Sequence, residues 1–123
     1  MVPRTSWYVN LRKMLPRAEW DRLRKRVYAQ YGHRCAICKG QGRLSCHEIW
    51  QYDDTSHIQR LAGFAALCSP CHHIKHLGFA TGLAEAGRLD FERLIRHFMR
   101  VNGCSREAFE AQQELAFRLW EER

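Results

Sequence analysis

Four cysteines stand in two closely spaced pairs, Cys35-x-x-Cys38 and Cys68-x-x-Cys71. Each pair places two thiolates at one tight turn, and four thiolates from two pairs suit the tetrahedral coordination of zinc. Because four sulfurs close the coordination sphere, the expected zinc ion is structural. An iron–sulfur cluster or a redox dithiol is the other chemistry open to such cysteines, but the basic, histidine-rich surroundings favour neither.

Five of the seven histidines lie between residues 47 and 76. His72 and His76 are four residues apart on an expected helix, so their side chains share one face. Such a pair is more often surface or core than ligand, but this pair follows directly after a predicted zinc ligand. His47, on an expected strand, is the natural third ligand. We therefore expect His47, His72 and His76 to form an open site for a second, catalytic divalent metal ion. His73 points away from His72 by helix geometry.

These residues need elements to position them. The spacing predicts a helix over 17–31, with an apolar spine of Trp20, Leu23, Val27 and Tyr31. A turn at Gly40 and Gly42 then leads into a strand over 44–52. A short helix is expected over 57–67, and a second helix begins at Pro70 and is weakened by Gly78 and Gly82.

The last part of the chain has the pattern of a helical hairpin. Asp90 can cap a helix with an apolar face, and Gly103 can end it. Ser105 can cap a following helix that runs to about residue 120. The expected apolar contacts are Phe91, Leu94, Ile95, Phe98 and Val101 on the first helix, and Phe109, Ala116, Leu119 and Trp120 on the second. Cys46 and Cys104 are assigned to packing.

The net charge of +7 is concentrated at one end of the chain. Residues 1–45 carry eleven Lys or Arg against two Asp or Glu, whereas the remainder is nearly neutral. This asymmetry favours a polyanionic partner, although a solvated basic helix face is the simpler alternative. Arg22, Lys25 and Arg26 fall mostly off the apolar spine and are the expected contacts to a nucleic-acid backbone. Such contacts carry little sequence specificity.

No stretch approaches the length of a membrane-spanning helix, and the first residues lack the apolar segment of a signal peptide. The sequence therefore predicts a cytoplasmic protein with no membrane partner, in a reducing compartment that favours metal-bound cysteines over disulfides.

The segments CAIC, SCHEIW and ALCSPCHHIKHLG resemble the HNH nuclease family in its zinc-containing ββα-metal form. The resemblance covers residues 35–78. It implies an α+β fold in which a small, zinc-stapled ββα-metal core follows an N-terminal helix and precedes a C-terminal helical hairpin. We expect residues 1–123 to form a single HNH-like domain, divided into a basic helical region (1–34), the metal core (35–80) and the hairpin (83–123).

In that family the strand motif carries a metal ligand followed by a general base. One register makes His47 the ligand and Glu48 the base, with Ile49 at the apolar position. The other makes His47 the base and puts Cys46 at the ligand position. The first register is preferred because three histidines then complete the metal site.

The chain also departs from the family at its middle Asn, which normally helps orient the strand bearing the base. No Asn lies between residues 47 and 72, and the corresponding position falls near Gly63. Gln59 is a candidate substitute.

The resemblance implies a metal-dependent endonuclease that hydrolyses phosphodiester bonds of DNA. The sequence leaves its oligomeric state open, with a homodimer or a larger nuclease complex as the candidates. Imidazole ligands favour manganese, nickel or zinc, with magnesium weaker. The alternative is a non-catalytic, zinc-stapled module that binds nucleic acid. A third reading is an accessory module of a larger nuclease assembly, in which the C-terminal hairpin is an interaction surface.

Overall fold

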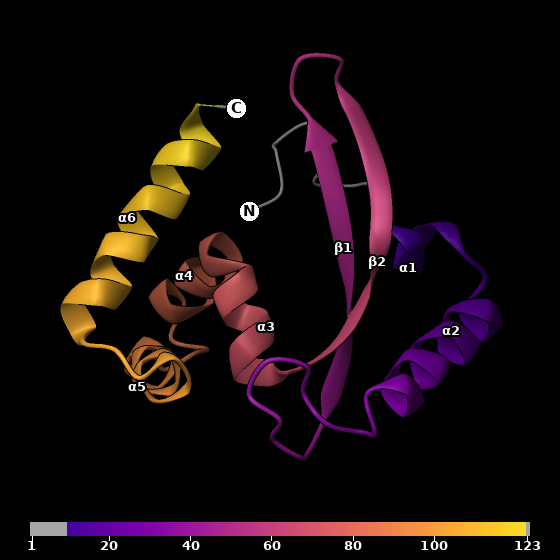
Figure 1. Ribbon diagram of the computed structural model, residues 1–123, viewed down its shortest axis with the longest axis horizontal. Coiled ribbons are helices and arrows are strands. Elements are labelled where there is room, and N and C mark those ends of the chain that lie inside the picture. Colours follow the sequence, from indigo (N-terminus) through magenta and orange to yellow (C-terminus); the bar gives the residue numbers. More distant parts are fainter. Residues whose placement is uncertain (1–9, 123) are drawn as a thin grey trace. The chain divides into compact units, whose positions relative to one another are not determined.

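The computed structural model describes residues 10–122. Within them the fold is α+β, as predicted, with six helices and one two-stranded antiparallel sheet (Figure 1). The elements in chain order are α1 (Leu11–Met14), α2 (Arg17–Gln30), β1 (Leu44–Asp53), β2 (Ile58–Cys68), α3 (Ser69–Lys75), α4 (Leu77–Glu85), α5 (Phe91–Asn102) and α6 (Arg106–Glu121). The finer expectation, a ββα-metal core, stays a prediction.

The described chain divides into two compact units at the junction between β2 and α3. The N-terminal unit comprises residues 10–68 and contains α1, α2 and the sheet. The C-terminal unit comprises residues 69–122 and contains α3 to α6. No helix among the described residues is long and apolar enough to cross a membrane.

The sheet is a long hairpin, visible in Figure 1 as two strands running side by side. Its register pairs Leu44 with Cys68 and Asp53 with Ile58. The turn is stabilised because a carboxylate oxygen of Asp53 accepts hydrogen bonds from two following backbone amides, those of Thr55 and Ser56. The predicted helix over 57–67 is therefore wrong, and this segment is the second strand.

The physical reason lies in the composition of β2. Ala62, Ala65 and Ala66 have high helix propensity, but backbone pairing with β1 overrides that local preference. The register shifts by one residue between Ile49 and Trp50, so that Ala62 is the extra residue of a β-bulge. A bulge bends the strand locally and re-aims the side chains beside it.

Helix α2 forms where the sequence predicts it, directly after Pro16. Trp20 and Val27 are buried as expected, but Tyr31 is exposed at the helix end rather than part of the apolar spine. The Tyr31 hydroxyl instead donates a hydrogen bond of 3.1 Å to the backbone oxygen of Phe64 on β2. This bond fixes the end of α2 against the hairpin.

The capping residues of the C-terminal hairpin act as predicted. The Asp90 carboxylate accepts from the amide of Glu92, and the Ser105 hydroxyl accepts from the amide of Ala108. Gly103 ends α5 in the left-handed region with φ of 59°. Such a conformation favours glycine because a Cβ would be strained there.

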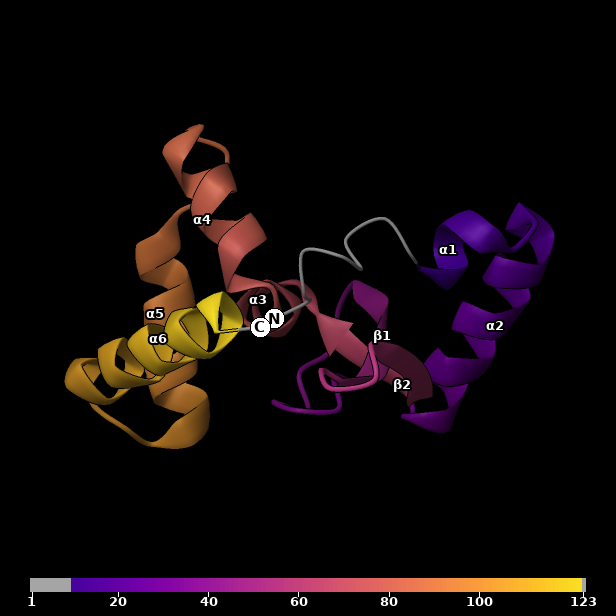
Figure 2. The same ribbon diagram turned by 90° about the horizontal axis from the view of Figure 1, so that it is seen from above.

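Helices α5 and α6 cross in Figure 2, and Ile95 of α5, Phe109 of α6 and Leu77 of α4 form one buried core. Phe91, Phe98, Met99 and Phe117 pack around these buried residues. Phe109 is 1% exposed, as the apolar pattern predicts. Leu119, in contrast, is 53% exposed, so its predicted burial is wrong.

Candidate metal centre

The turn between Cys35 and Gly40 is a tight backbone loop. The amide of Lys39 donates to the oxygen of Cys35, and the amide of Cys35 donates to the oxygen of Gly40. Lys39 adopts a φ of 64°, which is unusual for a residue with a side chain. A further bond, from the amide of Ala36 to the oxygen of Ala66, ties the loop to β2. These bonds hold the first cysteine pair beside the end of the hairpin.

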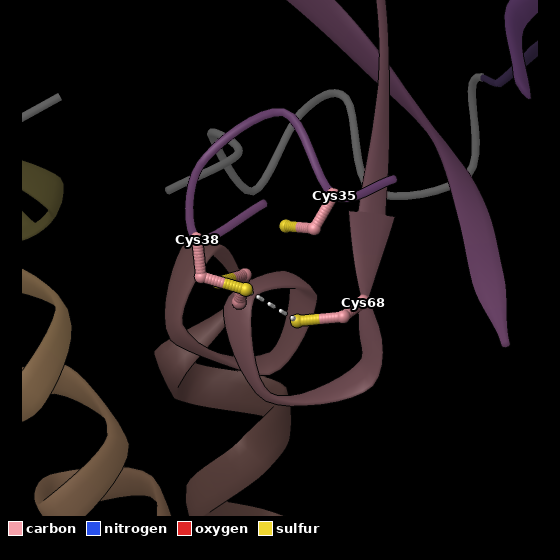
Figure 3. Close-up of side chains that lie close together, drawn as sticks. Cys35, Cys38 and Cys68 are labelled. Carbon is pink, nitrogen blue, oxygen red and sulfur yellow. Dashed lines mark hydrogen bonds between the residues drawn. The ribbon is translucent and has the colours of Figure 1, made fainter. Parts of the chain in front are cut away.

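The second pair spans the junction of a strand and a helix. Cys68 is the last residue of β2, and Cys71 lies in the first turn of α3. All six cysteines of the chain are thiols rather than disulfides. The Sγ atoms of Cys38 and Cys68 are 3.6 Å apart, and Figure 3 shows the thiols of Cys35, Cys38 and Cys68 turned toward a common point.

The four predicted cysteines form a group that can hold a metal ion such as zinc. The Sγ atoms of Cys35, Cys38, Cys68 and Cys71 all lie within 4.8 Å of one another. Four sulfurs at about 2.3 Å from one ion stand roughly 3.8 Å apart in a tetrahedron, so this spacing suits zinc. The chemistry of the donors agrees, because soft thiolates select zinc over hard cations.

Backbone amides prepare the thiolates for a cation. Burial of Cys35 opposes ionisation of its thiol, but hydrogen bonds from the backbone at Cys68, Cys38 and Ile37 outweigh burial and lower its pKa to about 6. The amide of Gly40 also donates to the Cys38 sulfur, at 3.4 Å. Because the thiolate is the form that ligates metals, these donors favour the binding form.

A second group is formed by the three predicted histidines. One ring nitrogen of each of His47, His72 and His76 lies within 4.8 Å of the others. The rings of His72 and His76 meet edge to face, with centroids 4.8 Å apart. Burial, and secondarily the charge of His73, lowers the pKa of His72. The neutral imidazole, which is the ligating form, is therefore favoured at this position.

The helix carrying the histidine pair is shorter than predicted. α3 ends at Lys75, and His76 has a φ of −120° and a ψ of 57°, outside helical geometry. The amide of His76 nevertheless donates to the backbone oxygens of His72 and His73, so one helical turn still connects the pair. The shared face needed for two ligands is kept even though the helix breaks.

Glu48, the predicted base, has both carboxylate oxygens in hydrogen bonds. Oε1 accepts from the amide of Leu11 at 2.8 Å, and Oε2 accepts from the indole Nε1 of Trp50 at 2.7 Å. Burial, followed by the charge of Glu48, raises the pKa of the Cys46 thiol to about 11. Cys46 belongs to neither metal-binding group found among residues 10–122. The geometry thus favours His47 over Cys46 as the strand ligand.

The candidate substitute for the family Asn lies far along the hairpin. Gln59 pairs with Tyr52, five residues beyond His47 on β1, which is roughly 16 Å at the usual rise per residue. Its side-chain nitrogen is buried without a hydrogen-bond partner among the described residues. Gly63, near which the resemblance places the family Asn, pairs with Ile49. The placement does not support Gln59 as the substitute.

The expected nucleic-acid contacts occupy the exposed side of α2. Arg22, Lys25 and Arg26 are all exposed. The neighbouring Arg24 is instead held by Asp21, with its Nε 2.9 Å from the carboxylate. Arg22, Lys25 and Arg26 thus place three exposed cations on one helix.

One functional candidate was not predicted from the sequence. His97 is buried on α5, and its ring contacts the sulfur of Cys71 at 3.1 Å. The available signal was a histidine at an inward-facing helix position between Leu94 and Val101.

Comparison of the chain with protein-family models, curated proteins and solved structures finds no match. The resemblance to HNH nucleases therefore rests on the quoted residues alone.

Proposed function

We propose that this protein is a metal-dependent endonuclease of the HNH type that hydrolyses phosphodiester bonds of DNA. The observation that carries the proposal is the convergence of His47, His72 and His76, whose ligand atoms lie within 4.8 Å of one another. Three imidazoles leave part of a coordination sphere open, which is the arrangement of catalytic rather than structural sites. The order of two strands followed by a helix agrees with the family pattern.

The two groups of side chains suit different metal ions because their donor atoms differ. The four cysteines suit a structural zinc ion because sulfur closes every position of a tetrahedron. The three histidines suit a later divalent metal, such as manganese, nickel or zinc, better than magnesium, which prefers oxygen ligands. A divalent cation bound there would supply Lewis-acid polarisation of the scissile phosphate and stabilise the leaving 3′ oxygen.

The proton of the attacking water needs an acceptor. Glu48 is adjacent to His47, and a carboxylate can accept about four hydrogen bonds, of which two are used by Leu11 and Trp50. In the alternative register His47 itself accepts the proton and is not a ligand. We keep Glu48 as the base, as in the first register. Substituting His47 and Glu48 one at a time distinguishes the two registers.

The exposed cations of α2 would hold the DNA backbone. Arg22, Lys25 and Arg26 make binding dependent on salt, since each neutralised phosphate releases counterions. Replacing all three by Ala should reduce the slope of log affinity against log salt by about 0.9 for each lost contact. Arg88→Ala, which removes an exposed charge from the C-terminal unit, is the matched control.

The test of catalysis is nicking of supercoiled plasmid in magnesium, manganese, nickel or zinc. Wild type should cut, whereas His72→Ala and His76→Ala should fall to background because each loses a cation ligand. His57→Ala is the control, since His57 is exposed at the hairpin turn and belongs to neither metal-binding group. Equal cutting by His72→Ala and wild type would contradict the proposal.

Two observations favour a second candidate, a non-catalytic zinc-stapled module that binds nucleic acid. The family Asn is replaced by Gly63, and both carboxylate oxygens of Glu48 are engaged elsewhere. A folded protein that holds one zinc, binds DNA with strong salt dependence and cuts nothing in any of the four metals would select this module over the nuclease.

A further inference from the structure

Helix α5 contains a buried histidine in an otherwise apolar position. His97 is 9% exposed, and Leu94 and Ile95 beside it are also buried. Burying a polar side chain without hydrogen bonds destabilises a fold, so both ring nitrogens need partners. The partners identify what this histidine does.

Each ring nitrogen of His97 has one neighbour at hydrogen-bond distance. Nδ1 lies 3.0 Å from Nη2 of Arg100, and Nε2 lies 3.1 Å from Sγ of Cys71. A guanidinium can only donate hydrogen bonds, so Nδ1 must be the accepting nitrogen. In a neutral imidazole the other nitrogen then carries the hydrogen. Nε2–H therefore points at the sulfur of Cys71.

We propose that His97 is a positioning residue of the four-cysteine metal site, donating an N–H···S hydrogen bond to the Cys71 thiolate, and that Arg100 sets its tautomer. His97 is not itself within the group of four convergent sulfurs. The donor orients the sulfur lone pairs and offsets part of the negative charge that four thiolates bring to one ion. Outer hydrogen bonds of this kind tune metal affinity.

Helix α5 of the C-terminal hairpin thus contributes to the metal site as well as to packing. Two successive hydrogen bonds connect the exposed side of α5 to a cysteine in the first turn of α3. The first joins Arg100 to His97, and the second joins His97 to Cys71. This role of His97 rests on metal binding by the cysteines and does not depend on whether the protein cuts DNA.

The test uses the full chain loaded with cobalt(II), which reports thiolate bonding through its sulfur-to-metal charge-transfer band. His97→Phe keeps a ring of similar size but removes the donor, and His97→Gln keeps an N–H donor. We expect His97→Phe to shift the band and weaken zinc binding by about 10- to 100-fold in chelator competition. His97→Gln should restore most of both properties. A merely structural role would instead make Phe at least as good as Gln in this apolar position.

Arg100→Leu provides a second variant, because it leaves His97 in place and removes the group that sets the tautomer. It should shift the cobalt band in the same direction as His97→Phe, whereas Arg96→Ala, an exposed position on the same helix, should not. If both His97→Phe and Arg100→Leu keep the wild-type cobalt spectrum and zinc affinity, the role of His97 is overturned while the cysteine metal site stands. Failure of wild type to bind cobalt or zinc would overturn it together with the cysteine metal site, whatever the outcome of the plasmid assay.

Discussion

The indole Nε1 of Trp50 donates to Oε2 of Glu48 at 2.7 Å, and the other carboxylate oxygen accepts from the amide of Leu11. Trp50 and Glu48 are two residues apart on β1, so a strand directs both side chains to one face. Leu11 is the first residue of α1, where backbone amides lack helical partners. Glu48 therefore joins the start of α1 to the hairpin.

This geometry predicts a structural cost for removing the carboxylate. Glu48→Ala should lower the free energy of unfolding of the metal-loaded protein by about 1–3 kcal/mol, because two donors lose a charged acceptor. Urea unfolding followed by tryptophan fluorescence measures the change. Gln51→Ala, an exposed neighbour on the same strand, should change stability by no more than about 0.5 kcal/mol. Equal stabilities of the Glu48 and Gln51 variants would show that the two bonds contribute nothing.

Gly63 offers a direct test of the departure from the HNH pattern. A Cβ at Gly63 would meet no atom within 4 Å, and its φ is not positive. Gly63→Asn should therefore fold with near wild-type stability. If the missing amide limits catalysis, the variant should cut plasmid faster than wild type in manganese, while Gly63→Ala should not. A folded Gly63→Asn variant that cuts no faster would contradict a role for this position in the reaction.

Many of the features that the sequence predicts correctly are local ones. Each cysteine pair, and each of the caps at Asp90 and Ser105, depends on residues two or three positions apart. The local pattern wrongly predicts a helix for β2, because its alanines favour a helix and only pairing with β1 overrides that preference. Glu48 and His97 each have one distant partner, Leu11 at 37 residues and Cys71 at 26 residues, and no local pattern could reveal these two contacts.

The turn of the first cysteine pair has little room at Gly40. A Cβ there would lie 3.3 Å from the sulfur of Cys38, and the same residue's amide donates to that sulfur. Gly40→Ala should push the sulfur away and weaken zinc binding, measured by competition with a chelator.

The control for this variant is the same change in an open position. Gly82 lies within α4, and its added Cβ would meet nothing within 4 Å. Gly82→Ala should leave zinc affinity unchanged and stabilise the fold by about 0.5–1 kcal/mol, as expected for a helix interior. Equal zinc affinities of both variants would exclude a steric role for Gly40.

The lowered pKa of Cys35, about 6, sets a pH dependence for metal binding. Well above pH 6 the Cys35 thiol is already ionised in the metal-free protein, so binding of a cation releases no proton from this residue. Below pH 6 one more proton must leave, and affinity falls more steeply with acidification. The stability of the metal-free fold depends on pH in the same direction. The depressed pKa of Cys35 stabilises this fold above the ordinary thiol pKa, and the stabilisation is lost as pH falls through about 6.

Calorimetry in buffers of different ionisation enthalpy counts the released protons. Zinc binding should release about 0.7 more proton from Cys35 at pH 5.5 than at pH 7.5, given a pKa of about 6. Cys46→Ala is the control, since the pKa of that thiol is raised to about 11 and Cys46 lies outside the cysteine group. It should show the same difference between the two pH values as wild type. An equal proton release at both pH values in wild type would mean that backbone amides do not hold Cys35 as a thiolate before the metal arrives.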